Sequence, residues 1–159
     1  MGANVFLARC DADGYERTIE STVDPSEYDD GPAALDGDAV RLWGVPEGKR
    51  NRNYFEAMES GDLVLFYLDD EYVASARVGT TFEDEEEWAS EEFWSTAAPL
   101  VYTLEDFTEI SVPGPAAHGI FEYAADYTPD ALSRVADGRV DNSLDGIELA
   151  LQRFSERNA

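Results

Sequence analysis

Cysteine, histidine and lysine each occur only once in this sequence of 159 residues. The lone Cys10 excludes an internal disulfide bond and offers no metal-ligand spacing, which indicates a reduced, cytoplasmic protein. The lone His118 is predicted to lie in a loop rich in proline, alanine and glycine, and the sequence has no Gly-x-Ser-x-Gly element to complete a catalytic set. We therefore expect no metal, no cofactor and no catalytic residues.

Basic residues are scarce as a class. The chain has 11 Lys and Arg against 35 Asp and Glu, a formal net charge of −24. Self-repulsion at this charge destabilises a compact state unless salt screens it, and at molar salt the Debye length is only about 3 Å. The near absence of lysine also suits a halophilic composition. We expect an extremely halophilic, archaeal source; the alternative is an acidic domain that binds a basic partner.

Long hydrophobic runs are also missing. No apolar stretch approaches the ~18 residues of a membrane span, and Val5–Ala8 is too short for a signal-peptide core. We therefore expect no membrane association. The composition is nevertheless 43% hydrophobic and 12% aromatic, enough for one substantial core. No linker or repeat interrupts the chain, so we expect a single domain over residues 1–159.

Short apolar segments predict five or six strands. Leu63–Leu68 and Tyr72–Val78 flank the turn signal Asp69-Asp70 and form a predicted hairpin. The other predicted strands are Asn4–Arg9, Val40–Trp43, and a pair at Pro99–Leu104 and Phe107–Val112.

Helices are predicted between these strands. The first half of the chain has a short predicted helix at Asp24–Glu27 and a second one through Tyr54, Phe55 and Met58 that ends near Gly61. A third predicted helix carries Trp88 and Trp94. A fourth starts at Thr128 with Leu132 and Val135 facing inward, and a fifth starts at about Ser143 with Leu144, Ile147, Leu151 and Phe154 on one face. Helices inserted irregularly between strands favour an α+β domain built on a small curved or closed sheet.

Three of the eleven basic residues, Lys49, Arg50 and Arg52, fall within four positions. They lie near the start of a predicted helix, where unpaired amides and the helix dipole attract anions. We interpret them as phosphate contacts, which arginine makes in a bidentate way; a solvated surface cluster is the alternative. Asn51 and Asn53 each offer a donor and an acceptor to a base edge, or else cap the helix.

The order of several short elements resembles the EVE domain family. The elements are Leu42-Trp43-Gly44-Val45, Arg52-Asn53-Tyr54, Met58, Gly61-Asp62 and Val64-Leu65-Phe66-Tyr67. Two departures stand out: residues 46–50 are inserted between the first two elements, and Leu68-Asp69 replaces the His-Ser pair that often follows in the family. The motifs cover residues 40–78 well and the remainder of the chain more weakly.

The resemblance implies a fold and a ligand. EVE domains are small PUA-like β-barrels with flanking helices, related to YTH domains, so we expect a barrel of five or six strands. These folds bind nucleic acids, and several receive a modified base in an aromatic cage. Some EVE-like modules are N-terminal readers of modification-dependent restriction systems, while others stand alone. By resemblance, this chain reads a modified, methylated base in DNA or RNA, with an NTPase or nuclease as a further partner.

The resemblance also suggests which residues form the cage. Trp43 and Trp94 are its expected walls, two indole planes facing each other across a slot, with Trp88 as another candidate second wall and Tyr67 as a lining residue. A flat indole face stabilises a stacked base by about 1 to 3 kcal/mol. Each of these aromatics has an alternative role in the core.

Two other functions compete with this one. An acidic protein-interaction or targeting module with no nucleic-acid ligand is the main alternative, and in it the aromatics serve only the core. An enzyme is disfavoured, because the sequence offers no acid, base and nucleophile set. We expect a monomer.

Overall fold

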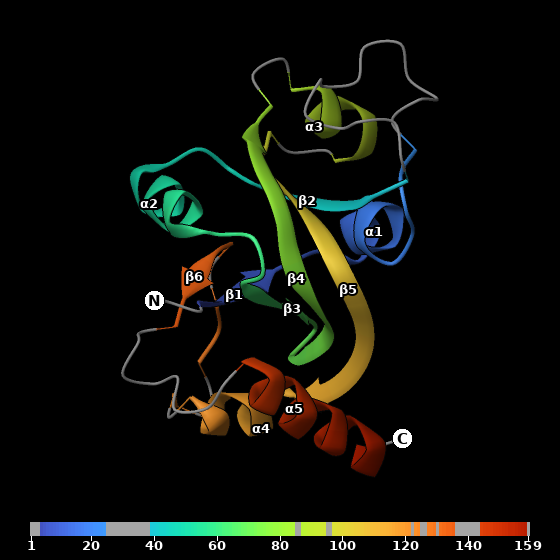
Figure 1. Cartoon of the computed structure of the whole chain (residues 1–159), viewed down its shortest axis with the longest axis vertical. Coiled ribbons are helices and arrows are strands. Elements are labelled where there is room, and N and C mark those ends of the chain that lie inside the picture. Colours follow the sequence, from blue (N-terminus) through green and yellow to red (C-terminus); the bar gives the residue numbers. More distant parts are fainter. Residues whose placement is uncertain are drawn as a thin grey trace. The chain divides into compact units, whose positions relative to one another are not determined.

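The computed structural model describes residues 4–24, 39–84, 87–94, 97–121, 123–124, 127–129, 131–135 and 144–158. Figure 1 shows the strands and helices of these segments. The helix predicted at Asp24–Glu27 lies outside them from Pro25 onward and stays a prediction.

Six strands are hydrogen-bonded in the order β2-β5-β4-β3-β1-β6. Their bounds are β1 Val5–Arg9, β2 Arg41–Val45, β3 Leu63–Leu68, β4 Glu71–Glu83, β5 Leu100–Pro113 and β6 Ser133–Arg134. With the helices described below, this arrangement confirms the predicted α+β class and the number of strands.

The chain divides into two compact units. Unit 1 comprises Met1–Cys10, Gly61–Arg77 and Asp106–Ala159, and unit 2 comprises Asp11–Ser60 and Val78–Glu105. Strands β4 and β5 each contribute residues to both units. The single domain over residues 1–159 stays a prediction.

Unit 1 is organised around β1, β3 and the start of β4. Strand β1 pairs parallel with β3, and β3 pairs antiparallel with β4. Asp69 and Asp70, at the turn between β3 and β4, have φ of 52° and 67°, the left-handed conformation that a tight hairpin turn requires. The hairpin prediction is therefore confirmed. Helices α4 (Gly114–Ile120) and α5 (Leu144–Asn158) contribute Ala117, Ile147 and Leu151 to the same hydrophobic core.

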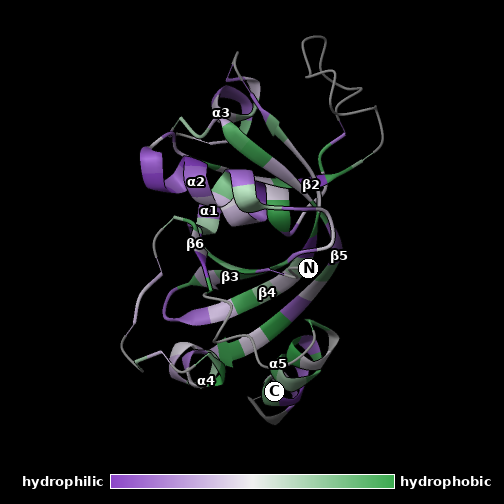
Figure 2. Ribbon diagram, turned by 60° about the vertical axis from the view of Figure 1, so that its left-hand side comes forward, coloured by the Kyte–Doolittle hydropathy of each residue, from purple (hydrophilic) through white to green (hydrophobic). Residues whose placement is uncertain are grey.

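Unit 2 contains β2, paired antiparallel with β5, and its described residues form four helical segments. These are α1 (Ala12–Gly14), the π-helical turn η1 (Tyr15–Ile19), α2 (Lys49–Ala57) and α3 (Trp88–Phe93). The buried Asp84 carboxylate accepts hydrogen bonds from the amides of Trp88 at 3.1 Å and Ala89 at 2.8 Å, so it satisfies the start of α3. Figure 2 shows α2 as largely hydrophilic, in keeping with Phe55 as its one buried residue.

Two predictions in the second half of the chain are wrong. Residues 100–113 form one strand, β5, rather than two, because Asp106 alone takes a left-handed φ of 51° and the chain does not reverse there. His118 lies in helix α4 rather than in a loop, since Pro115 occupies the first turn, where its missing amide costs no hydrogen bond.

A third prediction is half right. Leu132 and Val135 are buried, as expected, but Ser133–Arg134 between them pairs with β1 as strand β6 and is not helical. The final helix is confirmed as α5. Among the helices that the structure describes, none combines the length and hydrophobicity needed to cross a bilayer.

Candidate nucleic-acid interface

Trp43 and Trp94, the two predicted walls of the cage, lie together in unit 2. Their ring centroids are 5.4 Å apart and their planes meet at 69°, an edge-to-face contact. Trp43 is only 8% exposed, while Trp94 is partly exposed. The two indole planes therefore do not face each other as expected but meet at an angle, and the touching rings leave no slot for a base between them. We call this angled pair of Trp43 and Trp94 the corner.

Two glycines allow this close packing of the rings. A Cβ on Gly14 would lie 2.7 Å from the six-membered ring of Trp43, and one on Gly44 would lie 2.6 Å from that of Trp94. Side chains in packed interiors do not approach this closely, so both tryptophans occupy space that a larger residue at these positions would fill. The indole Nε1 of Trp94 also donates a hydrogen bond to the Thr18 hydroxyl at 3.3 Å.

Trp88 and Tyr67 occupy different settings. Trp88 is buried in the core of unit 2, where it packs edge to face against Phe93 at 5.4 Å. Tyr67 belongs to unit 1, and its hydroxyl donates to Asp70 at 3.1 Å. Burial, with the Asp70 contact as a second cause, raises the pKa of Tyr67 above its usual range. The role of Tyr67 as a lining residue stays a prediction.

A hollow of about 320 Å³ opens at the first turns of α2. It is lined by Lys49, Arg50, Asn53 and Tyr54. The Arg50 guanidinium carbon lies 5.7 Å from the centre of the Tyr54 ring, within range of a cation–π contact. Three of the residues predicted to bind phosphate or base therefore converge on one concave surface, and Tyr54 adds an aromatic face to it.

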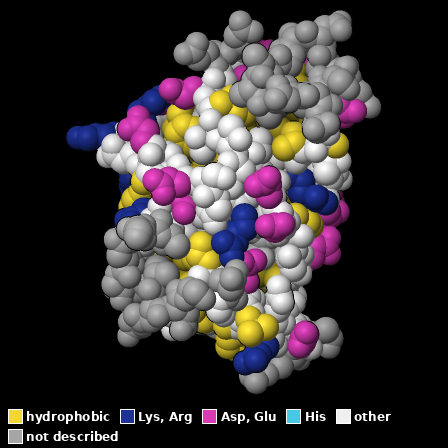
Figure 3. All heavy atoms as spheres, in the orientation of Figure 1, with side chains coloured by type: hydrophobic (Ala, Val, Ile, Leu, Met, Phe, Trp, Pro, Cys, Tyr) yellow, Lys and Arg dark blue, Asp and Glu magenta, His cyan; other side chains and the backbone are white. Residues whose placement is uncertain are grey.

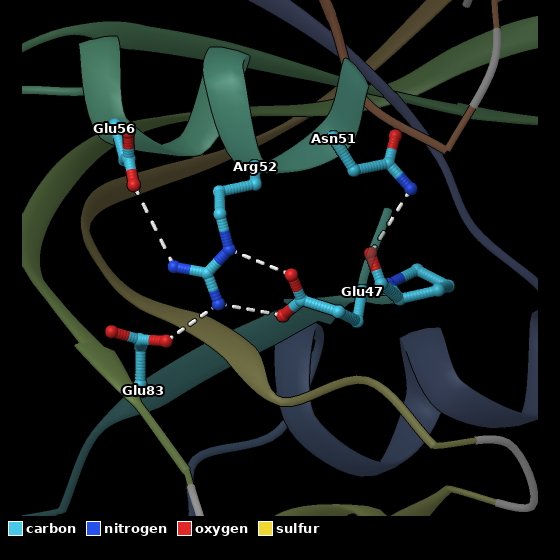
Figure 4. Close-up of polar contacts among 6 residues, drawn as sticks. Glu47, Asn51, Arg52, Glu56 and Glu83 are labelled. Atoms are coloured by element: carbon cyan, nitrogen blue, oxygen red, sulfur yellow. Dashed lines mark hydrogen bonds and ion pairs between the residues drawn. The ribbon is translucent and has the colours of Figure 1, made fainter. Parts of the chain in front are cut away.

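Arg52, by contrast, is held by carboxylates. It donates to Glu47 through two hydrogen bonds of 2.6 and 2.7 Å and to Glu83 at 2.6 Å, and Glu56 lies 3.6 Å away (Figure 4). The hydrogen bond from Arg52 lowers the pKa of the Glu47 carboxyl, while the hydrogen bonds to Glu47 and Glu83 raise the pKa of Arg52. We call these four residues the Arg52 clamp, which joins α2 to the loop before it and to the end of β4.

Asn51 also makes a structural contact. Its amide nitrogen donates to the carbonyl oxygen of Pro46 at 3.0 Å, which closes the turn that leads into α2 (Figure 4). Of the two candidate asparagines, Asn53 is the one that lines the hollow.

Acidic side chains lie among the predicted cluster of basic residues at the start of α2. Glu47, Glu56 and Glu83 all surround Arg52, so they offset its charge and much of the field of its basic neighbours. Figure 3 shows acidic and basic side chains mixed on the face that it presents. Lys49 and Arg50 remain the basic residues beside the hollow.

Similarity to known proteins is visible in the fold and not in the sequence. No protein-family model matches the chain, and no curated protein matches it. Among solved structures, the N-terminal domain of McrB from Thermococcus gammatolerans, bound to m5C DNA, matches with a TM-score of 0.71 at 18% identity. The match covers 93% of this chain and 99% of that domain. The chain has a PUA-like fold.

Two further structures of this PUA-like type match more distantly. Human THYN1, in complex with DNA containing 5-methylcytosine, has a TM-score of 0.50 at 10% identity, over 92% of this chain and 97% of that one. ASCH from Zymomonas mobilis has a TM-score of 0.52 at 9% identity, over 94% and 96%. The PUA-like fold is therefore established by geometry, and these similarities extend no further than the fold.

Three residues around the tryptophan pair and the hollow are not among those predicted to form the site. They are Gly14, Thr18 and Tyr54. For the first, a local signal exists: Asp11 three residues before Gly14 is a helix N-cap pattern, and its carboxylate accepts from the Gly14 amide at 3.0 Å. No local signal brings Thr18 to Trp94, because they are 76 positions apart.

Proposed function

We propose that this protein is a non-catalytic reader that takes a methylated base of a nucleic acid into the corner formed by Trp43 and Trp94. The observation that carries the proposal is the edge-to-face pair itself, in which Trp94 is only partly buried. DNA that contains 5-methylcytosine is the first candidate ligand, because the McrB domain and THYN1 were both solved with it. RNA and other methylated bases are the alternatives.

In the proposed mechanism, an extruded base stacks on Trp94 and turns one edge toward Trp43. Extrusion costs a few kcal/mol, and stacking on one aromatic ring stabilises the bound base by about 1 to 3 kcal/mol. A methyl group directed at the indole adds apolar contact that the unmodified base lacks, so it provides discrimination.

The hollow at α2 supplies the second part of the mechanism. Lys49 and Arg50 contact a phosphate of the bound strand, and Asn53 contacts a base edge or a sugar. Arg52, predicted to bind phosphate directly, acts instead by holding α2 in place through Glu47 and Glu83. Trp88 supports the core of the same unit.

The net charge of −24 opposes the binding of nucleic acid, which is also negatively charged. Phosphate-driven affinity falls steeply with salt, so a protein working in the molar-salt cytoplasm of a halophilic archaeon draws its binding free energy from stacking and burial instead. We propose that setting for this chain. We further propose that it acts as a monomer, either alone or with an NTPase or nuclease.

The test is fluorescence anisotropy in molar KCl with labelled oligonucleotides that are identical except for methylation. The wild type should bind the methylated strand more tightly. Trp94→Ala should lose about 5- to 150-fold in affinity, the equivalent of about 1 to 3 kcal/mol of stacking. Trp88→Phe is the matched control, since Trp88 is buried. Equal affinities for the two oligonucleotides, or a Trp94→Ala variant that binds like the wild type, would count against the proposal.

A second candidate, an acidic interaction module, is favoured by the charge and by the carboxylates gathered around Arg52. It predicts binding to a basic peptide that weakens with salt and is unaffected by Trp94→Ala. It also predicts that Trp43→Ala unfolds the protein without any separate effect on ligand binding.

A further inference from the structure

The turn after β1 contacts both tryptophans of the corner. Gly14, at the end of α1, lies against the Trp43 ring, since a Cβ there would be 2.7 Å from it. Four residues later, the Thr18 hydroxyl accepts the Nε1–H of Trp94 at 3.3 Å. A five-residue segment thus sets the position of two rings that come from β2 and from the end of α3.

Thr18 occupies the middle of a chain of hydrogen bonds. Its hydroxyl accepts from Trp94 and donates to the carbonyl oxygen of Gly14 at 3.3 Å. An indole N–H only donates and a carbonyl only accepts, so the residue between them must do both, as a hydroxyl does. Thr18 is fully buried, which leaves these groups no ready exchange with water.

The backbone of this segment is unusual in a way that serves these contacts. The Glu20 amide donates to the Tyr15 carbonyl at 2.8 Å, five residues back, so the turn is π-helical. Such turns are rare, and they are frequent at functional sites. The Thr18 side chain nevertheless bonds to the carbonyl four residues back, which ties the π turn to α1.

We infer that Thr18 is a positioning residue of the base site, which fixes the plane of the Trp94 indole against Trp43 by accepting its N–H. The inference rests on the proposed function, because the ring it holds is the proposed stacking surface. A stacking ring that is already oriented loses less conformational entropy on binding, so affinity depends on a hydroxyl that never touches the ligand.

The experiment compares Thr18→Val, which keeps the shape and removes the hydroxyl, with Thr18→Ser, which keeps the hydroxyl. The first readout is the circular dichroism of the coupled tryptophan pair, which needs no ligand. The second is affinity for methylated oligonucleotide in molar KCl. Thr18→Val should weaken the tryptophan signal and lower affinity about three- to tenfold, the range of one buried hydrogen bond. Thr18→Ser should restore both.

Thr103→Val is the matched control. Thr103 is also a buried threonine of unit 2, and its hydroxyl accepts from the Thr80 amide at 2.8 Å instead of from a tryptophan. The Thr103→Val variant should be less stable than the wild type. Its tryptophan signal and its affinity for the methylated oligonucleotide should equal those of the wild type.

Trp94→Phe keeps the inference testable if Thr18→Val folds poorly. It removes the N–H and leaves the hydroxyl, so it should lose affinity, and adding Thr18→Ala to it should cost little further affinity, because the hydrogen bond is already gone. A Thr18→Val protein with wild-type tryptophan signal, or a Thr18→Ser protein as impaired as Thr18→Val, overturns the positioning role. A wild-type protein that binds methylated and unmethylated oligonucleotides with equal affinity overturns the proposed function. In that case the circular dichroism of the tryptophan pair still decides whether Thr18 positions Trp94.

Discussion

Gly44 lies near the end of β2, where Trp94 packs against it. An added Cβ would lie 2.6 Å from the Trp94 ring and 2.6 Å from the carbonyl oxygen of Ala98. Neither neighbour is the end of a flexible side chain, so the backbone or the ring has to move. The glycine of the tryptophan-glycine-valine element is thus explained by close packing rather than by backbone conformation, since its φ is not positive.

We predict that Gly44→Ala destabilises the protein by about 1 to 3 kcal/mol, the usual cost of overpacking. The circular dichroism of the tryptophan pair should change with it. Gly119→Ala is the control, because a Cβ on Gly119 meets nothing within 4 Å. Urea denaturation of both variants makes the measurement. A Gly44→Ala protein as stable as the wild type means that Trp94 does not lie against β2.

The basic residues show how much is decided at the scale of one side chain. Lys49, Arg50 and Arg52 look equivalent in the sequence, which predicts a phosphate contact for each of them. The first two line the hollow, whereas Arg52 is surrounded by carboxylates. Glu83 is 31 positions from Arg52, so only the folded chain distinguishes this arginine from the other two basic residues.

At the scale of elements, α2 begins with basic residues in its first turn and no acidic one. Cations at this end oppose the helix dipole, so α2 relies on contacts outside itself. Arg52 provides them through Glu47 in the preceding loop and Glu83 at the end of β4. The Arg52 clamp therefore holds the hollow in place relative to the strands of unit 2.

We predict that Arg52→Met lowers the unfolding temperature at neutral pH, and that Arg17→Met does not. Arg17 makes an exposed pair with Asp13, which is expected to contribute little. Arg52 instead joins a network of three carboxylates. Equal unfolding temperatures for the two variants, measured by differential scanning calorimetry, would show that the Arg52 clamp is not structural.

The Arg52 clamp also predicts a pH dependence. The pKa of Glu47 is lowered in the folded state from its usual value of 4.5 by the Arg52 hydrogen bond. The contribution of the ionised Glu47 carboxylate to the free energy of unfolding is therefore complete above pH 4.5, and it is lost as the pH falls through the lowered pKa. The stability difference between the wild type and Glu47→Gln should be largest near neutral pH and should shrink in acid. A difference that is constant with pH contradicts this assignment.

At the scale of the whole molecule, the net charge of −24 is the dominant feature. Carboxylates that repel one another favour expansion of the chain, and salt screens this repulsion over a Debye length that falls from about 10 Å at 0.1 M to about 3 Å at 1 M. Stability and salt are thus linked for this protein whatever its ligand is.

We predict that the unfolding temperature rises as KCl is increased from about 0.1 M to molar concentration, because the Debye length shortens over this range. Sucrose at matched water activity is the control, because it stabilises compact states without screening charge. An unfolding temperature that is flat over this range, or that rises equally in sucrose, would rule out charge repulsion as the main cause.

Most of the strands are predictable because each is encoded by its own residues. β1, β2, β3 and the turn at Asp69-Asp70 follow from apolar runs and turn chemistry within a few positions. The errors fall where neighbours are a poor guide. Glu105-Asp106 resembles a turn but lies inside β5, and Thr128-Pro129 resembles a helix start but precedes β6. Pairing of Ser133–Arg134 with β1 overrides the local preference there, and at Glu105-Asp106 the strand continues beyond the residues that pair with β2.

The sequence by itself determined the charge, the exclusion of an internal disulfide and most of the strand segments. Only the tertiary structure decided that Trp43 and Trp94 meet edge to face, that Arg52 is bound by three carboxylates, and that Thr18 reaches the indole. The reason is physical. Strand and helix patterns arise from contacts between near neighbours, whereas the orientation of these side chains depends on partners 31 and 76 positions away.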